Sequence, residues 1–269
     1  MFAAIGSGTI SFVSAFGDLS RFGWQMTRWL TPDLWRFRTW LRAMPLFFEI
    51  GNRSLPVIMI TGTFVGLVLA VQSYDQLKAA GFESRMGVLV TLSLVKELGP
   101  VLAGVMVAGR VGGALTAELG TMRVTDQISA MQVMGVDPVR YLVVPRFLAC
   151  LLLTPLLTFC CDLCGSLAGW FIAVMLKQLP SSPYWYYIQS SVETYDVMVG
   201  FVKSVVFGGA IGLISCYKGF TCRQGAEGVG RACTESFVIS FIAILVTDFF
   251  LGTFTSGLYS GIYGFKSLV

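Results

Sequence analysis

The hydrophobic positions of this chain fall into five long runs. The first, Leu55 to Tyr74, is twenty residues long and contains no charged side chain. Four comparable runs follow, at residues 87–109, 147–176, 197–217 and 236–258. A helix needs about twenty apolar residues to cross the hydrocarbon core of a bilayer. The pattern therefore predicts an all-α membrane protein with five transmembrane helices.

Composition supports this class and limits the rest of the chain. Hydrophobic residues make up 55% of the 269 residues and charged residues only 13%, too few to cover a soluble core of this size. The five runs leave short loops and no room for a soluble catalytic domain. The net charge of +4 is small and dispersed, so we expect no nucleic-acid partner. The chain has no histidine, and Cys161 and Cys164 lack further ligands at zinc-site spacing, so we expect no metal site and buried structural thiols.

The loops carry basic residues asymmetrically. Twelve lie on one side of the predicted membrane, before the first run and after the second and fourth; they are Arg21, Arg28, Arg36, Arg38, Arg42, Arg53, Arg123, Arg140, Arg146, Lys218, Arg223 and Arg231. The other side has four, namely Lys78, Arg85, Lys177 and Lys266. Cytoplasmic loops are enriched in Lys and Arg, so the N-terminus should be cytoplasmic and the C-terminus external.

The segment from Arg21 to Met44 differs from the five runs. It holds four of the six tryptophans, interleaved with arginines, and Pro32 divides it. Indole rings favour the membrane–water boundary, and a basic amphipathic helix lies in that boundary. We therefore expect an interfacial elbow helix here; the alternative is an ordinary helix packed on protein.

Glycines at GxxxG spacing predict close helix contacts in four places. The pairs are Gly62 and Gly66, Gly165 and Gly169, Gly208 and Gly212, and Gly257 and Gly261. They indicate a compact bundle and allow a subunit interface without locating it. The third run has thirty residues and contains Pro155, so we expect that helix to tilt, bend or project beyond the bilayer.

Charged residues inside the predicted spans are the first functional signal. Each costs about 2.5–3.5 kcal/mol at mid-membrane on the insertion scale, so each should face protein or a watery cavity. They are Lys96, Glu97, Asp162, Lys203 and Asp248. For Asp162 and Asp248 two interpretations remain: they form ion pairs that fix helix packing, or they line a polar cavity for the substrate. For Lys96 and Glu97 the adjacent Gly99–Pro100 favours a cavity between subunits, so we expect Glu97 not to be held permanently in an ion pair within one bundle.

The loop after the second span predicts a short helix. Thr125 can cap it, Asp126 lies in its first turn, and Gly135 with Pro138 would end it after roughly ten residues. This helix is too short to span a bilayer. Exposed Met122, Met131 and Met134 would suit an adaptable docking surface. The alternative is a loop helix folded onto its own bundle.

These central residues also carry a family resemblance. The runs are Leu94-Val-Lys-Glu-Leu-Gly-Pro, then Ala108-Gly-Arg-Val-Gly-Gly-Ala-Leu-Thr-Ala-Glu-Leu-Gly-Thr-Met-Arg-Val-Thr-Asp-Gln, then Asp137-Pro138 and Pro145-Arg146. They closely resemble the MlaE family, the permease subunits of Mce-associated ABC lipid transporters. The likeness extends from about Leu55 to Thr247-Asp-Phe-Phe. The chain departs from the family pattern at two positions. Lys96 stands where arginine is expected and Asp126 where glutamate is usual, and both replacements keep the sign of the charge.

The resemblance implies an N-terminal segment (1–54) with an interfacial elbow helix, and a five-span permease domain (55–269) with a cytoplasmic coupling helix at about 121–137. The implied protein is a homodimer in the bacterial inner membrane and the phospholipid-conducting subunit of an ABC transporter. It is not itself an enzyme and holds no cofactor, because a separate cytoplasmic ABC ATPase binds ATP and magnesium. A periplasmic MCE-domain protein and a small STAS-type cytoplasmic subunit are the further implied partners.

The resemblance also implies roles for individual residues. Candidates for the lipid pocket are Lys96, Glu97, Leu67, Val71 and Lys203. Candidates for ATPase coupling are Arg123, Asp126, Gln127, Met131, Met134 and Asp137. Structural charges are expected at Arg110, Glu118, Asp162 and Asp248.

Three other classes of protein compete with this interpretation. An ion-coupled secondary transporter would use the buried carboxylates, but such proteins often show repeated halves, and none is evident. A membrane enzyme would need a nucleophile or an acid–base constellation, which does not stand out. A non-transporting structural membrane subunit is the third alternative. ATP-dependent transport together with a co-purifying ATPase would separate the first interpretation from all three.

Overall fold

A computed structural model describes residues 2–33 and 37–263 of the chain. Within these ranges the protein is helical and has no strand. Five helical rods are long and apolar enough to cross a membrane, and they include all five predicted runs. The predicted all-α membrane class is therefore confirmed.

The helices have the following bounds. The N-terminal part comprises α1 (Phe2–Asp33) and the first rod, α2 (Phe37–Ala79). The second rod comprises η1 (Glu83–Arg85), α3 (Met86–Ser93), η2 (Leu94–Leu98), α4 (Gly99–Val107), η3 (Ala108–Gly112) and α5 (Gly113–Val124). Then come α6 (Gln127–Val133), η4 (Val139–Val143), α7 (Val144–Phe171), η5 (Ile172–Leu176) and α8 (Ser181–Ser191). The last two rods are α9 (Thr194–Phe220) and α10 (Ala226–Tyr263).

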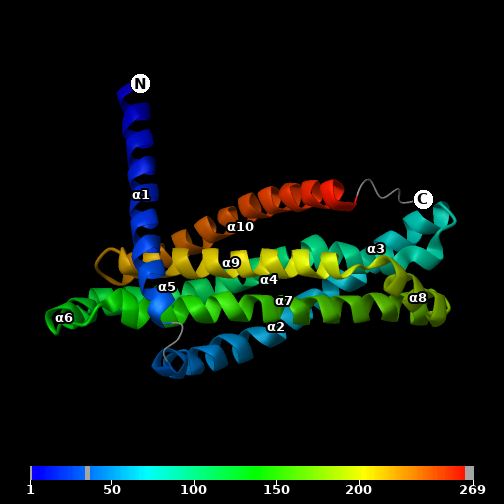
Figure 1. Cartoon of the computed structure of the whole chain (residues 1–269), viewed down its shortest axis with the longest axis horizontal. Helices are drawn as coiled ribbons and strands as arrows, with labels where there is room; N and C mark the ends of the chain where they lie inside the picture. The colour runs from blue at the N-terminus through cyan, green and yellow to red at the C-terminus, as the bar shows by residue number, and fades with distance from the viewer. Residues whose placement is uncertain (1, 34–36, 264–269) are drawn as a thin grey trace.

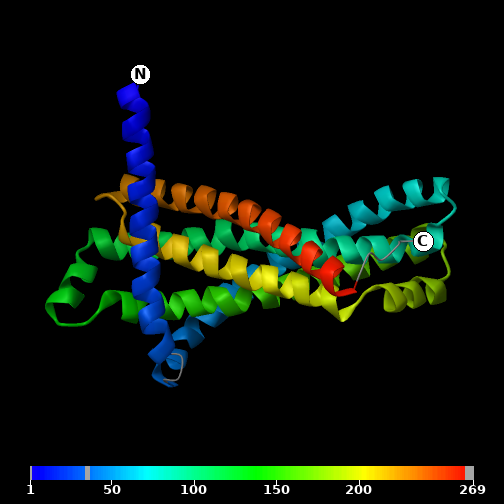
Figure 2. The same cartoon turned by 45° about the horizontal axis from the view of Figure 1, so that its top comes forward.

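The rods form one bundle whose two ends differ (Figure 1). Helix α6 and the connection from α9 to α10 lie at one end, and α8 lies at the other. Helix α1 stands across the bundle axis near the α6 end in both views (Figure 2). The loops therefore group by end as the basic residues predict, with the N-terminal helix on the arginine-rich side.

The N-terminal segment differs in part from the expectation. The helix α1 ends at Asp33, one residue after Pro32, and α2 begins at Phe37, so the segment divides next to Pro32 as expected. Trp35 and Arg36 lie outside the described residues. The positions from Phe37 onward belong to α2, which continues without interruption past Leu55 into the first span. The crosswise helix is thus α1, and Met44 belongs to the spanning rod.

The third span is a single long rod. Helix α7 continues through Pro155, and η4 and η5 extend it to residues 139–176. At 1.5 Å per residue these 38 residues measure about 57 Å, nearly twice the hydrocarbon core. The rod is therefore longer than the bilayer core, as expected, and Pro155 does not end it; that the rod tilts, bends or projects stays a prediction.

Glycine contacts explain how tightly the rods pack. Gly62 and Gly66 of α2 lie on the backbone of Cys161 and Gly165 in α7, where a Cβ atom would clash. A Cβ atom at Gly208 would lie 2.6 Å from the Cys150 carbonyl, which brings α9 equally close to α7. Gly257, by contrast, has open space around it. Three of the four GxxxG pairs therefore form close contacts between helices of the same protomer.

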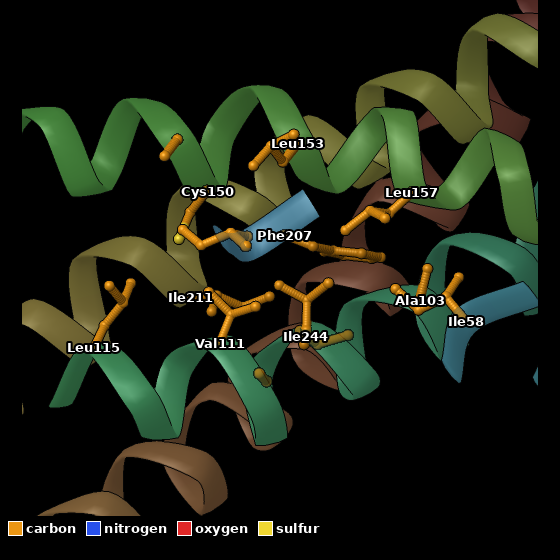
Figure 3. Close-up of a cluster of buried hydrophobic side chains, with 14 of the residues drawn as sticks. Ile58, Ala103, Val111, Leu115, Cys150, Leu153, Leu157, Phe207, Ile211 and Ile244 are labelled. Carbon is orange, nitrogen blue, oxygen red and sulfur yellow. The ribbon is translucent and has the colours of Figure 1, made fainter. Parts of the chain in front are cut away.

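The main hydrophobic core lies where the rods meet (Figure 3). Phe207 and Ile211 of α9 are fully buried in it, and side chains of the other four rods surround them. The surrounding residues include Ile58, Ala103, Val111, Leu115, Cys150, Leu153, Leu157 and Ile244. This core holds the five rods together.

Candidate substrate site and coupling segment

A buried lysine joins two carboxylates in the middle of the bundle. Lys203 of α9 has a side chain only 1% exposed. Its Nζ lies 2.5 Å from Oε2 of Glu97 in η2 and 2.9 Å from Oδ1 of Asp248 in α10. An ammonium group so buried needs compensating charge, and two carboxylates from two other rods supply it. Asp248, expected as a structural charge, is therefore part of the same cluster as the pocket candidates.

Glu97 is paired inside the protomer and also partly exposed on its surface. Oε2 pairs with Lys203, yet 53% of the Glu97 side chain is exposed on the surface of the protomer. In this structure Glu97 is thus paired within its own bundle, and the expectation that the pair is not permanent stays a prediction. The exposed part of the carboxylate still leaves one side of the cluster open to a ligand or a partner.

Lys96 forms a second pair at the start of α9. Its Nζ lies 2.7 Å from Oδ1 of Asp196, whose side chain is 7% exposed. The other carboxylate oxygen of Asp196 accepts a hydrogen bond of 3.1 Å from the Glu193 backbone N–H, which closes the first turn of α9. One carboxylate thus caps the helix and holds Lys96. The sequence interpretation missed Asp196, although its place before an apolar run was a capping signal.

The local backbone is irregular where these adjacent residues reach different partners. Lys96 and Glu97 lie in η2, a π-helical turn of five residues just before Gly99 and Pro100. Such π-bulges are rare and occur frequently at functional sites. In this rod Lys96 extends toward Asp196 and Glu97 toward Lys203 from within the bulge.

The two apolar pocket candidates lie on α2. Leu67 packs against the core cluster that contains Val90 and Leu94, and Val71 is 41% exposed. The contacts of the charged cluster come from η2, α9 and α10 rather than α2. Assignment of Leu67 and Val71 to the pocket remains a prediction.

Asp162 behaves differently from the other charges in the spans. Its Oδ1 is buried and has no hydrogen-bond partner among the residues that the structure describes. The carboxylate packs directly on Gly99, where any Cβ atom would occupy the same space. Asp162 also lines a mainly apolar cavity of about 280 Å³ between α3, α7, α8 and α9. It is therefore a packed polar group and not a member of an ion pair with a described side chain.

The coupling segment is a short helix at the end of the bundle. Helix α6 spans seven residues and starts after Asp126, which has the left-handed φ of 58°. Thr125 does not cap α6 as expected, because it ends α5 and its hydroxyl donates to the Thr121 carbonyl. Gly135, with φ of 74°, ends the segment as predicted. Asp137 then accepts a hydrogen bond of 2.9 Å from the Val139 N–H at the start of η4.

The methionines of this segment divide into two groups. Met122 and Met131 are half-buried and pack against a core cluster of their own protomer, so their predicted exposure is wrong. Met134 is 70% exposed and Val133 is 89% exposed. An exposed apolar pair at the tip of a loop is the part of the segment free to contact another protein.

Similarity to known proteins bears on both sites. Residues 44–254 match the family model described as Permease MlaE, which is well over half of the chain. The chain belongs to the MlaE permease family. A "Probable ABC transporter permease protein" of Rickettsia felis is 41% identical over 92% of this chain and 95% of its own length. The "Intermembrane phospholipid transport system permease protein MlaE" of Haemophilus influenzae is 38% identical over 75% of this chain and 78% of its own length.

A more distant relative comes from a plant. The chloroplastic protein TRIGALACTOSYLDIACYLGLYCEROL 1 of Arabidopsis thaliana is 34% identical over 80% of this chain and 61% of its own length. The resemblance stated from the motifs is thereby confirmed over the region that holds both the charged cluster and α6.

In this MlaE-family permease the expected structural charges are only partly paired. Arg146 in α7 places Nη2 3.0 Å from Oε2 of Glu118, and its Nη1 donates to the Leu142 carbonyl at 2.9 Å. Glu118 therefore helps to anchor the end of the coupling segment, through an arginine that the sequence interpretation had not assigned to a site. No carboxylate of the described residues forms a salt bridge with Arg110.

Proposed function

We propose that this chain is the membrane permease subunit of an ABC phospholipid transporter. It forms the lipid pathway and transmits work from a separate cytoplasmic ATPase. Membership of the MlaE family, whose Haemophilus relative is named for intermembrane phospholipid transport, supports the class of substrate. The ATPase binds ATP and magnesium, so this chain itself holds no cofactor and catalyses no reaction.

The observation that carries the proposal is the half-open cluster of Glu97, Lys203 and Asp248. It places charged groups at mid-span, where isolated charges are expensive, with one side exposed to whatever lies next to the protomer. A phospholipid crossing the bilayer must bring its polar headgroup through this depth. The exposed side of the Glu97 carboxylate, held by the buried Lys203, offers a polar surface at that depth without opening the rest of the apolar bundle.

We further propose that the functional unit is a homodimer with the lipid pocket between its subunits. Helix α10 supports this arrangement, because only 11% of the residues in its most apolar stretch are buried within the protomer. The corresponding share for the third span is 56%. Asp248 of the charged cluster lies on α10, so a second copy covering α10 would enclose the exposed side of Glu97. The pocket would then belong to both subunits.

The remaining assembly follows from the two ends of the bundle. We place α1, α6 and the α9–α10 connection on the cytoplasmic side of a bacterial inner membrane, and the C-terminus on the periplasmic side. The ATPase docks at the tip of α6, and a STAS-type subunit belongs on the same side. An MCE-domain protein covers the end that holds α8.

Reconstitution tests the function directly. The chain is co-expressed with its ATPase and MCE-domain partners, and transfer of a fluorescent phospholipid between liposomes is measured with and without ATP. We expect ATP-dependent transfer that falls strongly in Glu97→Gln, while the complex still assembles. Transfer that follows an imposed proton or sodium gradient and ignores ATP would instead indicate a secondary transporter, and a complex without any transfer would indicate a structural subunit.

A further inference from the structure

A cavity with charged lining residues lies away from the Glu97 cluster. It has a volume of about 370 Å³ and is formed by one face of α2 and one face of η3 and α5. Both helices contribute a charged rim and an apolar floor. The lining residues are Leu46, Glu49, Ile50, Arg53, Ser54, Arg110, Val111, Ala114, Leu115 and Glu118.

The depth of this cavity in the bilayer follows from the helix rise. Arg110 is 25 positions after Arg85, which ends η1 at the opposite end of the second rod. At 1.5 Å per residue the two arginines are about 38 Å apart, slightly more than the hydrocarbon core. Arg53 lies just before the first apolar run. Both arginines of the cavity are therefore at the headgroup level of the leaflet on the α6 side.

The rim carries two arginines and two glutamates, and one of the arginines has no carboxylate partner among the described residues. Glu49 pairs with Arg53 at 2.8 Å, and Glu118 pairs with Arg146 at 3.0 Å. Arg110 is exposed and has no carboxylate partner among the described residues. The cavity therefore presents a free guanidinium, with a second arginine on the facing helix whose side chain is 69% exposed.

The apolar lining of the cavity favours an amphipathic ligand over a small hydrophilic anion. Ile50, Val111 and Leu115 are each buried and form an apolar surface beneath the arginines. A guanidinium binds phosphate with two parallel hydrogen bonds, and basic pockets between membrane helices bind lipid headgroups. An apolar floor next to that guanidinium suits the glycerol and the first part of an acyl chain.

We infer that this cavity is a binding site for the headgroup phosphate of a phospholipid in the leaflet on the α6 side. Arg110 binds the phosphate, Arg53 and Ser54 contact it from α2, and the apolar floor accepts the lipid backbone. The site is separate from the Glu97 cluster, because Arg110 lies 13 positions further along the rod, about 20 Å away. It does not depend on the proposed transport function.

Photocrosslinking from inside the cavity tests this inference. Ala114, an exposed lining residue, is replaced by p-benzoylphenylalanine in the full chain, and the protein is placed in nanodiscs of equimolar phosphatidylethanolamine and phosphatidylglycerol. Intact mass after illumination should show one phospholipid adduct. Arg110→Gln should lower the adduct yield by roughly tenfold, since the variant loses the charge-assisted hydrogen bonds to the phosphate. Arg110→Lys should give an intermediate yield, because lysine keeps the charge without the bidentate geometry.

Two controls separate a site from ordinary lipid contact. The same probe at Leu89, exposed on α3 toward the other leaflet, should give adducts that Arg110→Gln does not change. Arg85→Gln should leave the Ala114 adduct unchanged. If Arg110→Gln does not fold, Arg53→Gln replaces it, because Arg53 is exposed and its loss should also lower the yield.

The contrary outcomes are specific. An adduct at Ala114 that is equal in wild type and Arg110→Gln would overturn recognition of the phosphate. A crosslink from Ala114 to a second copy of the chain would assign the cavity to a protein interface and overturn the lipid site. Binding of inorganic phosphate to the purified protein, together with no lipid adduct at Ala114 in nanodiscs, would show a site for free phosphate and overturn the proposal.

Discussion

Lys203 and Glu97 are 106 positions apart in the chain, yet Nζ of the first lies 2.5 Å from Oε2 of the second. The lysine is almost fully buried, whereas the glutamate is half-exposed. This asymmetry means that the two partners contribute differently. Removing the lysine leaves two acids without a buried cation, while removing the glutamate charge leaves Lys203 paired with Asp248.

The first prediction compares Lys203→Met with Glu97→Gln. Breaking a buried ion pair by removing one partner costs about 3–5 kcal/mol, so Lys203→Met should lower the thermal unfolding temperature markedly. Glu97→Gln should change it by no more than a small fraction of that amount. Unfolding of the purified protein in detergent, followed by intrinsic fluorescence or circular dichroism, provides the measurement. Equal destabilisation by the two variants would contradict the asymmetric arrangement.

The second prediction concerns the contact between Gly99 and Asp162. Gly99→Ala should destabilise the protein, because the added methyl group meets the Asp162 carboxylate. Gly113→Ala is the matched control, since nothing lies within 4 Å of a Cβ atom there and alanine favours a helix over glycine by about 1 kcal/mol. Thermal unfolding should fall for the first variant and stay level or rise for the second. A Gly99→Ala variant as stable as wild type would show that Asp162 moves away at little cost.

Much of the fold could be predicted from sequence because bilayer spans leave a strong one-dimensional signal. The five apolar runs and the grouping of the loops by end both appear in the structure. The course of α1 was less accessible. Pro32 correctly marked a division, because α1 ends at Asp33, but the extension of α1 back to Phe2 and the place of Met44 in the spanning rod were not predicted.

The sequence predicted which charged residues belong to the site, but not which of them pair with one another. The cost of burying Lys96, Glu97, Lys203 and Asp248 identified them, but pairing across three rods depends on packing that no local pattern encodes. The same limit applies to Met131, which helical spacing cannot distinguish from the exposed Met134. The role of Arg146 was missed because its partner Glu118 lies 28 positions away on another rod.

The third prediction concerns topology. On a background without the native cysteines, cysteines placed at Ser129 and Gln224 should react with a membrane-impermeant maleimide only after the inner membrane is opened. Cysteines at Ala80 and Ser182 should react from outside, because these loops lie at the other end of the bundle (Figure 1). The physical reason is the excess of arginine and lysine on the α6 side. Labelling of position 129 from outside in intact spheroplasts would reverse the proposed orientation.

The last prediction separates docking from packing within the coupling segment. Met134→Glu places a charge on an exposed side chain at the tip of α6, so the permease should remain folded while association with the ATPase falls. Met131→Glu buries a charge against the core of its own protomer, so it should lower stability itself. Pull-down of the ATPase, lipid-stimulated ATP hydrolysis and thermal unfolding are measured for both variants. We expect Met134→Glu to lose association at an unchanged unfolding temperature, and Met131→Glu to lower that temperature. Full association in Met134→Glu would mean that the exposed tip of α6 does not contact the ATPase, and the docking surface would then have to lie elsewhere at the α6 end of the bundle.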